Sequence, residues 1–204
     1  MKNVLQINSS ILGEHSVSKS LSDYAADLLS QHRGAKITIR ETGGLPHLTG
    51  ETLAAFSNTS EALDAEGKAL VETSNELIDE VKAADTIILG VPTYNFFIPS
   101  QLKSYLDFIA RAGVTFKYTE TGPVGLLDDK TVYVINASGG VYHATGEDLV
   151  GPYIEKIMGF IGIQDVHFVR AEGLALDQGA NKESIITQAK NRLKEMLAVD
   201  EVTA

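Results

Sequence analysis

The loop at residues 92–97 carries the residue types best suited to hold a flat ring with polar edges. Tyr94, Asn95 and Phe96 follow an apolar run at 86–91, which predicts a buried parallel strand, and precede a segment with helical spacing. Loops at the carboxyl ends of strands are where open α/β sheets bind ligands. The aromatic faces, the amide and the backbone N–H groups would meet such a ring on its face and its edge. Aromatic residues at strand ends also serve as core, so the loop alone leaves that alternative open.

A second loop, at residues 9–18, is rich in serine and leads into a predicted helix. Ser10, Ser16 and Ser18 offer hydroxyl donors, and a helix that begins near Ser16 offers free N–H groups and the positive end of its dipole. This combination suits a phosphate, although neither the Walker A pattern nor the glycine pattern of dinucleotide-binding folds is present. The alternative is that Ser16 only caps the helix.

A third loop brings small residues after another predicted strand. Ala137, Ser138, Gly139 and Gly140 would let the backbone approach a ligand closely, because glycine has no Cβ. A plain turn is the alternative here. One phosphate site and one planar-ring site together describe a mononucleotide such as FMN, whose reduced form would be stabilised by backbone N–H donors in these loops.

The elements that must position these loops alternate between strand and helix. Apolar runs predict five strands, at residues 3–8, 36–41, 85–91, 130–136 and 164–171, with helices between them. This alternation predicts an α/β fold with a five-stranded parallel sheet, helices on both faces and the flavodoxin-like strand order 2-1-3-4-5. In that order the first, third and fourth strands are neighbours, so the three loops should meet at one edge of the sheet.

We expect residues 1–204 to form one domain with two excursions from the sheet. Residues 47–84 are long for one strand connection and predict a helical insertion of two helices, the longer one capped at 58–61. Residues 113–126 predict a loop or hairpin, and a final helix is expected over 181–199.

Composition argues against several classes of function. The chain of 204 residues has a formal net charge of −10 at pH 7, whereas nucleic-acid and anionic-membrane surfaces need clustered Lys and Arg. It has no cysteine, which excludes disulfides, thiolate metal sites and Cys nucleophiles. No apolar run approaches the ~20 residues of a membrane span and the start lacks the features of a signal peptide, so we expect a cytoplasmic protein.

The chain resembles the FMN-dependent NADH-azoreductases, relatives of flavodoxin and of the quinone reductases. The resemblance covers essentially the whole chain, and four segments in the same order carry it: residues 9–18, 92–96, 110–116 and 159–162. It implies a flavodoxin-like homodimer with one noncovalent FMN per subunit near the dimer interface. It also implies NADH or NADPH as the electron donor and quinones or azo compounds as acceptors.

The resemblance further implies which residues would form the site. The phosphate positions correspond to Ser10, Ser16, Val17 and Ser18. The flavin-ring positions correspond to Thr93, Tyr94, Asn95, Phe96, Ala137, Ser138, Gly139 and Gly140. The substrate side corresponds to Tyr118 and to Phe160, which would reach across from the partner subunit.

Three residues near the third loop bear on substrate choice. Ser138 stands where the family often has a basic residue before the two glycines, and Tyr142 stands where it often has a histidine after them. We place His143 beside the site, where it would steady a flavin carbonyl or an incoming oxygen; a solvated loop histidine is the alternative.

The implied reaction is ping-pong, needs no metal and no protein nucleophile, and cleaves an azo bond in two cycles of two electrons each. Three rival functions stay open: a flavodoxin-type one-electron carrier, a hydrolase that uses a serine of the 9–18 loop, and a flavodoxin-like scaffold without cofactor. The hydrolase lacks the G-x-S-x-G elbow. The acidic composition favours NADH over NADPH, because a 2′-phosphate would need a basic partner.

Overall fold

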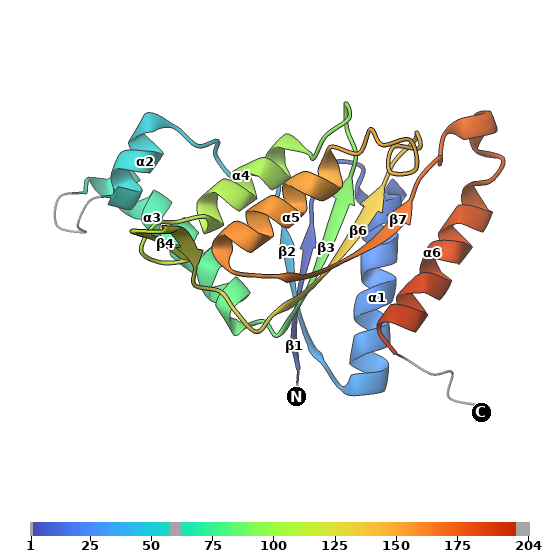
Figure 1. The fold of residues 1–204 in the computed structure, drawn as a ribbon, viewed down its shortest axis with the longest axis horizontal. Coiled ribbons are helices and arrows are strands. Elements are labelled where there is room, and N and C mark those ends of the chain that lie inside the picture. The colour runs from blue at the N-terminus through green and yellow to red at the C-terminus, as the bar shows by residue number, and fades with distance from the viewer. Residues whose placement is uncertain (1, 58–62, 199–204) are drawn as a thin grey trace.

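A five-stranded parallel sheet forms the centre of the molecule (Figure 1). The structure is a computed structural model that describes residues 2–57 and 63–198. The strand order is β2-β1-β3-β6-β7. This is the order predicted from the sequence, renumbered because two hairpin strands fall between β3 and β6. The strands are β1 (Asn3–Asn8), β2 (Lys36–Glu41), β3 (Thr86–Pro92), β6 (Thr131–Ala137) and β7 (Asp165–Ala171).

Helices cover both faces of the sheet, as the alternation of elements predicts (Figure 1). One face packs against α1 (Val17–Arg33) and α6 (Lys182–Met196). The other packs against α3 (Ala65–Ala83), α4 (Ser100–Ile109) and α5 (Val150–Ile161). Successive strand residues face opposite sides, so Ile87 and Leu89 join one core while Ile88 between them joins the other.

Two short 3₁₀ helices flank the carboxyl edge of the sheet, η1 (Gly13–His15) and η3 (Leu176–Gly179). Together with the loops after β1, β3 and β6, they form the surface at that edge of the sheet. None of the helices in the described residues is long and apolar enough to cross a membrane.

The 47–84 stretch holds two helices, α2 (Gly50–Ser57) and α3. The expected cap at 58–61 lies outside the described residues. Helix α3 begins later, because Asp64 Oδ1 accepts a hydrogen bond from the Gly67 N–H at 2.8 Å. The prediction that the last helix extends to residue 199 was too long, since α6 ends at Met196 and Ala198 turns to a positive φ of 46°.

The second excursion is an antiparallel hairpin of β4 (Phe116–Thr119) and β5 (Gly122–Gly125). It is fixed to the end of α5, where the N–H groups of Leu126 and Leu127 donate to the Ile161 carbonyl at 3.1 and 2.9 Å. The hairpin therefore lies against the end of α5 that is remote from the β6–α5 loop.

Candidate functional site

The three loops predicted to converge line one open cavity of about 220 Å³ at the carboxyl edge of the sheet. They meet because β1, β3 and β6 are neighbours in the sheet. Nine of the predicted cofactor-binding residues line this cavity: Ser10, Ser16, Val17, Ser18, Thr93, Tyr94, Ala137, Ser138 and Gly139.

The serine loop ends in the N-terminus of α1. Ser16 is the N-cap, and its Oγ accepts from the Lys19 N–H at 3.1 Å and lies 3.1 Å from Ser18 Oγ. The cap interpretation is thus correct, and it is compatible with a ligand, because the first N–H groups of a helix have no acceptor within it. A helix start with two buried serine hydroxyls is a suitable place for a phosphate.

Tyr94 joins the aromatic loop to the serine loop. Its hydroxyl lies 2.9 Å from Ser10 Oγ and accepts from the Ile11 N–H at 3.3 Å. The backbone of Tyr94 also closes a tight turn, since its N–H donates to the Phe97 carbonyl at 2.9 Å and its carbonyl accepts from the Phe97 N–H at 3.1 Å.

The two central residues of that turn have left-handed backbone conformations. Asn95 has a φ of 49° and Phe96 a φ of 69°. Asparagine tolerates this region, but phenylalanine rarely adopts it, and such strain concentrates at binding and catalytic sites. The Phe96 side chain is also 65% exposed. A strained loop that holds an aromatic ring in solvent is typical of a surface made to stack on a ligand.

The third loop is tied to the second through β3 and β6. The Thr93 N–H donates to the Ala137 carbonyl at 2.8 Å, and Asn136 Nδ2 donates to Thr93 Oγ1 at 3.0 Å. Ser138 Oγ donates to the Gly140 carbonyl at 2.8 Å. These bonds fix the relative position of the two loops that would hold a ring.

The Tyr142 side chain lies close to Gly140 of the third loop. A Cβ on Gly140 would lie 2.9 Å from the Tyr142 hydroxyl, so this side chain folds back over the loop. Its ring meets Phe96 edge-on with centroids 5.8 Å apart. Glu172 holds the segment, because its Oε1 accepts from the N–H groups of Tyr142 and His143 at 2.9 and 3.0 Å. The sequence singled out Tyr142 as a departure from the family pattern but assigned it no contact.

Some predicted residues do not line the cavity of their own chain: Asn95, Phe96, Gly140, Tyr118, Phe160 and His143. The first three adjoin it through the loops just described. His143 is directed to Asp148, with Nδ1 3.6 Å from Oδ2.

Tyr118 and Phe160 belong to an aromatic cluster on the hairpin and the end of α5. The Phe116 ring lies 5.5 Å from Tyr118 and 4.2 Å from Phe160, between centroids. Phe160 follows the start of α5 by ten residues, which is about 15 Å along a helix axis. The cluster is therefore displaced from the loops at the other end of α5.

Three of the residues that line the cavity lie outside the predicted loops: Leu174, Ala175 and Lys182. The Leu174 N–H donates to the Ser138 carbonyl and the Ala175 N–H to the Gly139 carbonyl, both at 3.1 Å. These hydrogen bonds hold the two residues beside the third loop. Lys182 comes from the start of α6. A basic residue that opens the helix after the last strand was the available signal for it.

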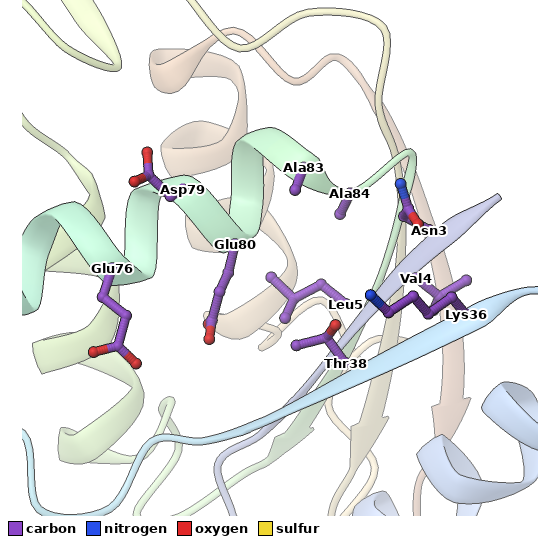
Figure 2. A pocket seen from close by; sticks show the side chains of 10 residues that line it. All are labelled: Asn3, Val4, Leu5, Lys36, Thr38, Glu76, Asp79, Glu80, Ala83 and Ala84. Atoms are coloured by element: carbon purple, nitrogen blue, oxygen red, sulfur yellow. The ribbon is translucent and has the colours of Figure 1, made fainter.

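A larger cavity, of about 450 Å³, lies between α3 and the strands β1 and β2, on residues from the amino-terminal part of those strands (Figure 2). Its wall carries Glu76, Asp79 and Glu80. Two of these accept hydrogen bonds from Arg40 of β2, Glu76 at 2.5 Å and Glu80 through both of its oxygens. The hydrogen bonds that the guanidinium donates to Glu80 raise the pKa of Arg40. Carboxylates repel a phosphate or a reduced ring, so this cavity does not suit a mononucleotide.

The carboxyl-edge cavity does suit one. It offers serine hydroxyls, a helix start and two tied loops, and no carboxylate of the described residues lines it. Its 220 Å³ is below the ~300–1,000 Å³ usual for small-molecule pockets. The cavity of one chain is therefore small for a whole mononucleotide, and the exposed Phe96 lies beside it.

The sheet order and the site at its carboxyl edge define a flavodoxin-like α/β protein. A family model for the flavodoxin-like fold matches residues 2–197. Among curated proteins, an FMN-dependent NADH:quinone oxidoreductase of Alcanivorax borkumensis is 46% identical over 94% of this chain and 98% of its own length. A protein of the same name from Cellvibrio japonicus is 43% identical over 97% of this chain and 100% of its own.

Solved structures agree with these relatives. An azoreductase from Bacillus anthracis superposes with a TM-score of 0.84 at 28% identity, covering 96% of this chain and 98% of its own. An FMN-dependent NADH-azoreductase from the same organism, in complex with FMN, superposes with a TM-score of 0.82 at 29% identity, covering 96% and 99%. The chain belongs to this family of flavodoxin-like FMN-dependent NADH:quinone oxidoreductases and azoreductases.

Proposed function

We propose that this protein is an FMN-dependent oxidoreductase that transfers two electrons from NADH or NADPH to quinones and reductively cleaves aromatic azo compounds. The observation that carries the proposal is the single cavity formed by the serine loop, the Tyr94 loop and the 137–139 loop, with no carboxylate of the described residues lining it. The names and coverage of the relatives support it. We also propose that residues 1–204 act as one domain.

The serine loop would hold the phosphate. Ser10, Ser16 and Ser18 would donate hydroxyl hydrogen bonds, and the N–H groups of Val17 and Ser18 would donate from the helix start. These donors are fixed before binding by the Ser16 cap and by the contact of Tyr94 with Ser10, so little ordering is needed on binding.

The other two loops would hold the ring. Its edge would meet Thr93, Tyr94, Asn95 and Phe96 on one side and Ala137, Ser138, Gly139 and Gly140 on the other. Backbone N–H groups at Asn95 and Gly139 would donate to a ring edge as negative charge develops there. Tyr94 and Phe96 would exclude water from one part of the ring.

FMN, when bound, supplies the two-electron chemistry by accepting a hydride from the nicotinamide donor and giving the electron pair to the acceptor. A quinone takes two electrons and two protons to become a hydroquinone, at the expense of one NADH. An azo bond takes four electrons and four protons to become two amines, at the expense of two NADH. Donor and acceptor would use the same exposed side of the site in turn, so the kinetics would be ping-pong.

We further propose a homodimer in which the partner subunit completes the substrate side. One chain leaves Phe96 at 65% exposure beside the cavity and carries Tyr118, 75% exposed, on the distant hairpin. A two-fold pairing would bring the partner's Tyr118 and the partner's Phe160 over the ring. Apolar surface for this pairing comes from exposed Ile11 and Leu12 in the serine loop and from exposed Val124 on the hairpin.

The donor is proposed to be NADH, and the compartment the cytoplasm, where this donor is available. A 2′-phosphate would need its own basic partner, and the basic side chains lining the cavity are His15 and Lys182, among the residues that the structure describes. His143, if it turns from Asp148, would serve the incoming acceptor.

The test is the visible spectrum of the protein after FMN addition and desalting, repeated anaerobically with NADH and then with a quinone. Retained flavin absorption that bleaches with NADH and returns with one equivalent of quinone supports the proposal. Retained flavin that neither NADH nor NADPH bleaches favours the one-electron carrier. No retained flavin refutes FMN dependence and returns the hydrolase and scaffold alternatives.

The contribution of the partner subunit can be tested by mixing two inactive variants. Phe160→Ala has an intact FMN site, and the double variant Ser16→Ala with Ser18→Ala has an intact Phe160. Mixed dimers would regain activity at one of their two sites if Phe160 acts across the interface. No recovery in mixtures whose exchange is verified by native mass spectrometry would place Phe160 in its own subunit's site instead.

A further inference from the structure

The lining of the carboxyl-edge cavity is neutral except for two basic side chains. Hydroxyls of serine, threonine and tyrosine supply most of its polar groups, and His15 and Lys182 are its basic side chains. The chain as a whole has a formal net charge of −10, so a phosphate dianion approaches an unfavourable overall field. A cation at the site would offset this field locally.

The packing of α1 and α6 places Lys182 level with the serine loop. Both helices begin at the carboxyl edge of the sheet and cover the same face. Lys190 of α6 lies over the Tyr24 ring of α1, 5.1 Å from its centroid. Eight residues back along each helix, about 12 Å for both, are Lys182 and Ser16.

The far ends of the two helices keep the same register. The Arg33 guanidinium near the end of α1 donates to the Leu197 carbonyl just after α6. Counting from Ser16 and Lys182, these residues are seventeen and fifteen positions on. The helices therefore run side by side over their full length, and the starts of both adjoin the cavity.

Lys182 is placed against the preference of its own helix. It is the first residue of α6, where the helix dipole favours anions over cations. It forms no hydrogen bond or ion pair with any residue that the structure describes. The ammonium group is exposed and lies at the cavity, so it is available to a ligand there.

We infer that Lys182 binds the 5′-phosphate of FMN, alongside the serine hydroxyls and the start of α1. This inference rests on the proposed function. Lys182 and the serines line the same cavity, so its ammonium would interact favourably with a phosphate at the serine loop.

The experiment compares the binding of FMN and of riboflavin, which lacks the phosphate, by quenching of flavin fluorescence. The variants are Lys182→Met, Lys182→Arg and the control Lys190→Met, which removes the same charge about 12 Å further along α6. Lys182→Met should raise the FMN Kd about tenfold, equivalent to about 1.4 kcal/mol. Lys182→Arg and Lys190→Met should stay within about twofold of the wild type.

Riboflavin and salt separate the phosphate contact from other effects. The riboflavin Kd should change by less than about twofold in Lys182→Met, and the loss of FMN affinity between about 20 and about 200 mM KCl should be shallower than in the wild type. An FMN Kd that Lys182→Met changes no more than Lys190→Met does would overturn the inference. So would equal losses for FMN and riboflavin.

Two further outcomes identify a different cause. If Lys182→Met raises the KM for NADPH and leaves the FMN Kd unchanged, the ammonium faces the 2′-phosphate of the donor and the assignment to FMN is wrong. If the wild type binds neither flavin, the proposed function itself fails. If the wild type binds FMN tightly and Lys182→Met has the same FMN Kd, only the lysine contact is refuted.

Discussion

The contact between the β4–β5 hairpin and the end of α5 has no room for a side chain at Gly125. A Cβ there would lie 2.0 Å from the Gly162 nitrogen, 2.3 Å from the Gly162 Cα and 2.3 Å from the Ile161 carbonyl carbon. Real Cβ contacts stay above 3.0 Å. All three atoms are backbone, so none can rotate away, and Gly125→Ala must push the hairpin off the helix.

The size of the effect follows from the contacts that would be lost. The two hydrogen bonds to the Ile161 carbonyl, from Leu126 and Leu127, contribute about 0.5–1.5 kcal/mol each. The Phe116–Phe160 ring contact at 4.2 Å adds about 0.5–1.5 kcal/mol. We expect Gly125→Ala to lower the free energy of unfolding by about 2–4 kcal/mol.

Urea unfolding followed by circular dichroism measures this loss, and Gly50→Ala is the control. Gly50 has no atom within 4 Å of a Cβ built on it and no positive φ, so its replacement should stay within about 0.5 kcal/mol of the wild type. The hairpin also carries Tyr118 and contacts Phe160. Gly125→Ala should therefore raise the KM for a quinone several-fold while the FMN Kd stays within about twofold.

The reasoning fails if Gly125→Ala unfolds at the same urea concentration as the wild type, because the close approach of the two backbones would then be wrong. It also fails in its functional part if the FMN Kd and the quinone KM rise together. That result would mean that the hairpin supports the cofactor loops and not a separate substrate side.

Three further predictions concern the loops and one buried hydroxyl. Ser16→Ala should lower the free energy of unfolding by about 1 kcal/mol and Ser16→Gly by a few tenths, whereas both should weaken FMN at least about tenfold in a fluorescence titration; equal FMN affinity in wild type and Ser16→Gly would contradict the phosphate contact. Glu172→Ala should weaken FMN several-fold, with Glu172→Gln between it and the wild type, because Gln keeps one acceptor for the Tyr142 and His143 N–H groups; no change on titration would show that the loop holds itself. Tyr105→Phe should raise the free energy of unfolding by about 1 kcal/mol at pH 7, since the buried Tyr105 hydroxyl has no partner among the described residues. Burial raises the pKa of Tyr105, so the folded state keeps its proton above pH ~10 where the unfolded chain loses it, and stability should fall above that pH less steeply in Tyr105→Phe; identical wild-type and variant urea midpoints from pH ~8 to ~11 would refute this.

The central strands β1, β3 and β6 could be predicted closely because they are largely buried on both faces, whereas the exposed edge strand β2 was predicted from its alternating isoleucines. The bounds expected for the first two strands, 3–8 and 36–41, coincide with β1 and β2, and β3 differs from its expected bounds by one residue at each end. In a protein of this size, a continuous apolar run has to be buried in the core. Strand order then followed from the alternation with helices.

Helix starts were less predictable, because several residues in a row could serve as caps. The segment before α3 offered polar residues at 58–61, but Asp64 accepts the hydrogen bond that begins the helix. At the start of α1, Ser16 was the one residue predicted as the cap, and the structure confirms it. The difference lies in how many candidates compete for the same unsatisfied N–H groups.

Residues that enter the site from distant elements carried the weakest signal. Lys182 lies far along the chain from the serine loop, and only the parallel packing of α1 and α6 brings the two together. The contact of Tyr142 with Phe96 likewise depends on a loop that folds back over Gly140. A motif search finds residues that are close in sequence, whereas these contacts depend on tertiary packing.

The two ends of α5 adjoin different parts of the proposed site. At its start, the Asp148 carboxylate accepts from the N–H groups of Val150 and Gly151, both at 2.9 Å, next to the loop that would hold the ring. At its end, Gly162 takes a φ of 111° and admits the hairpin with its aromatic cluster. Changes at the start should therefore alter FMN affinity, and changes at the end should alter the acceptor KM through the partner subunit. A set of variants that moved both quantities together, at either end, would argue for one continuous site within a single chain.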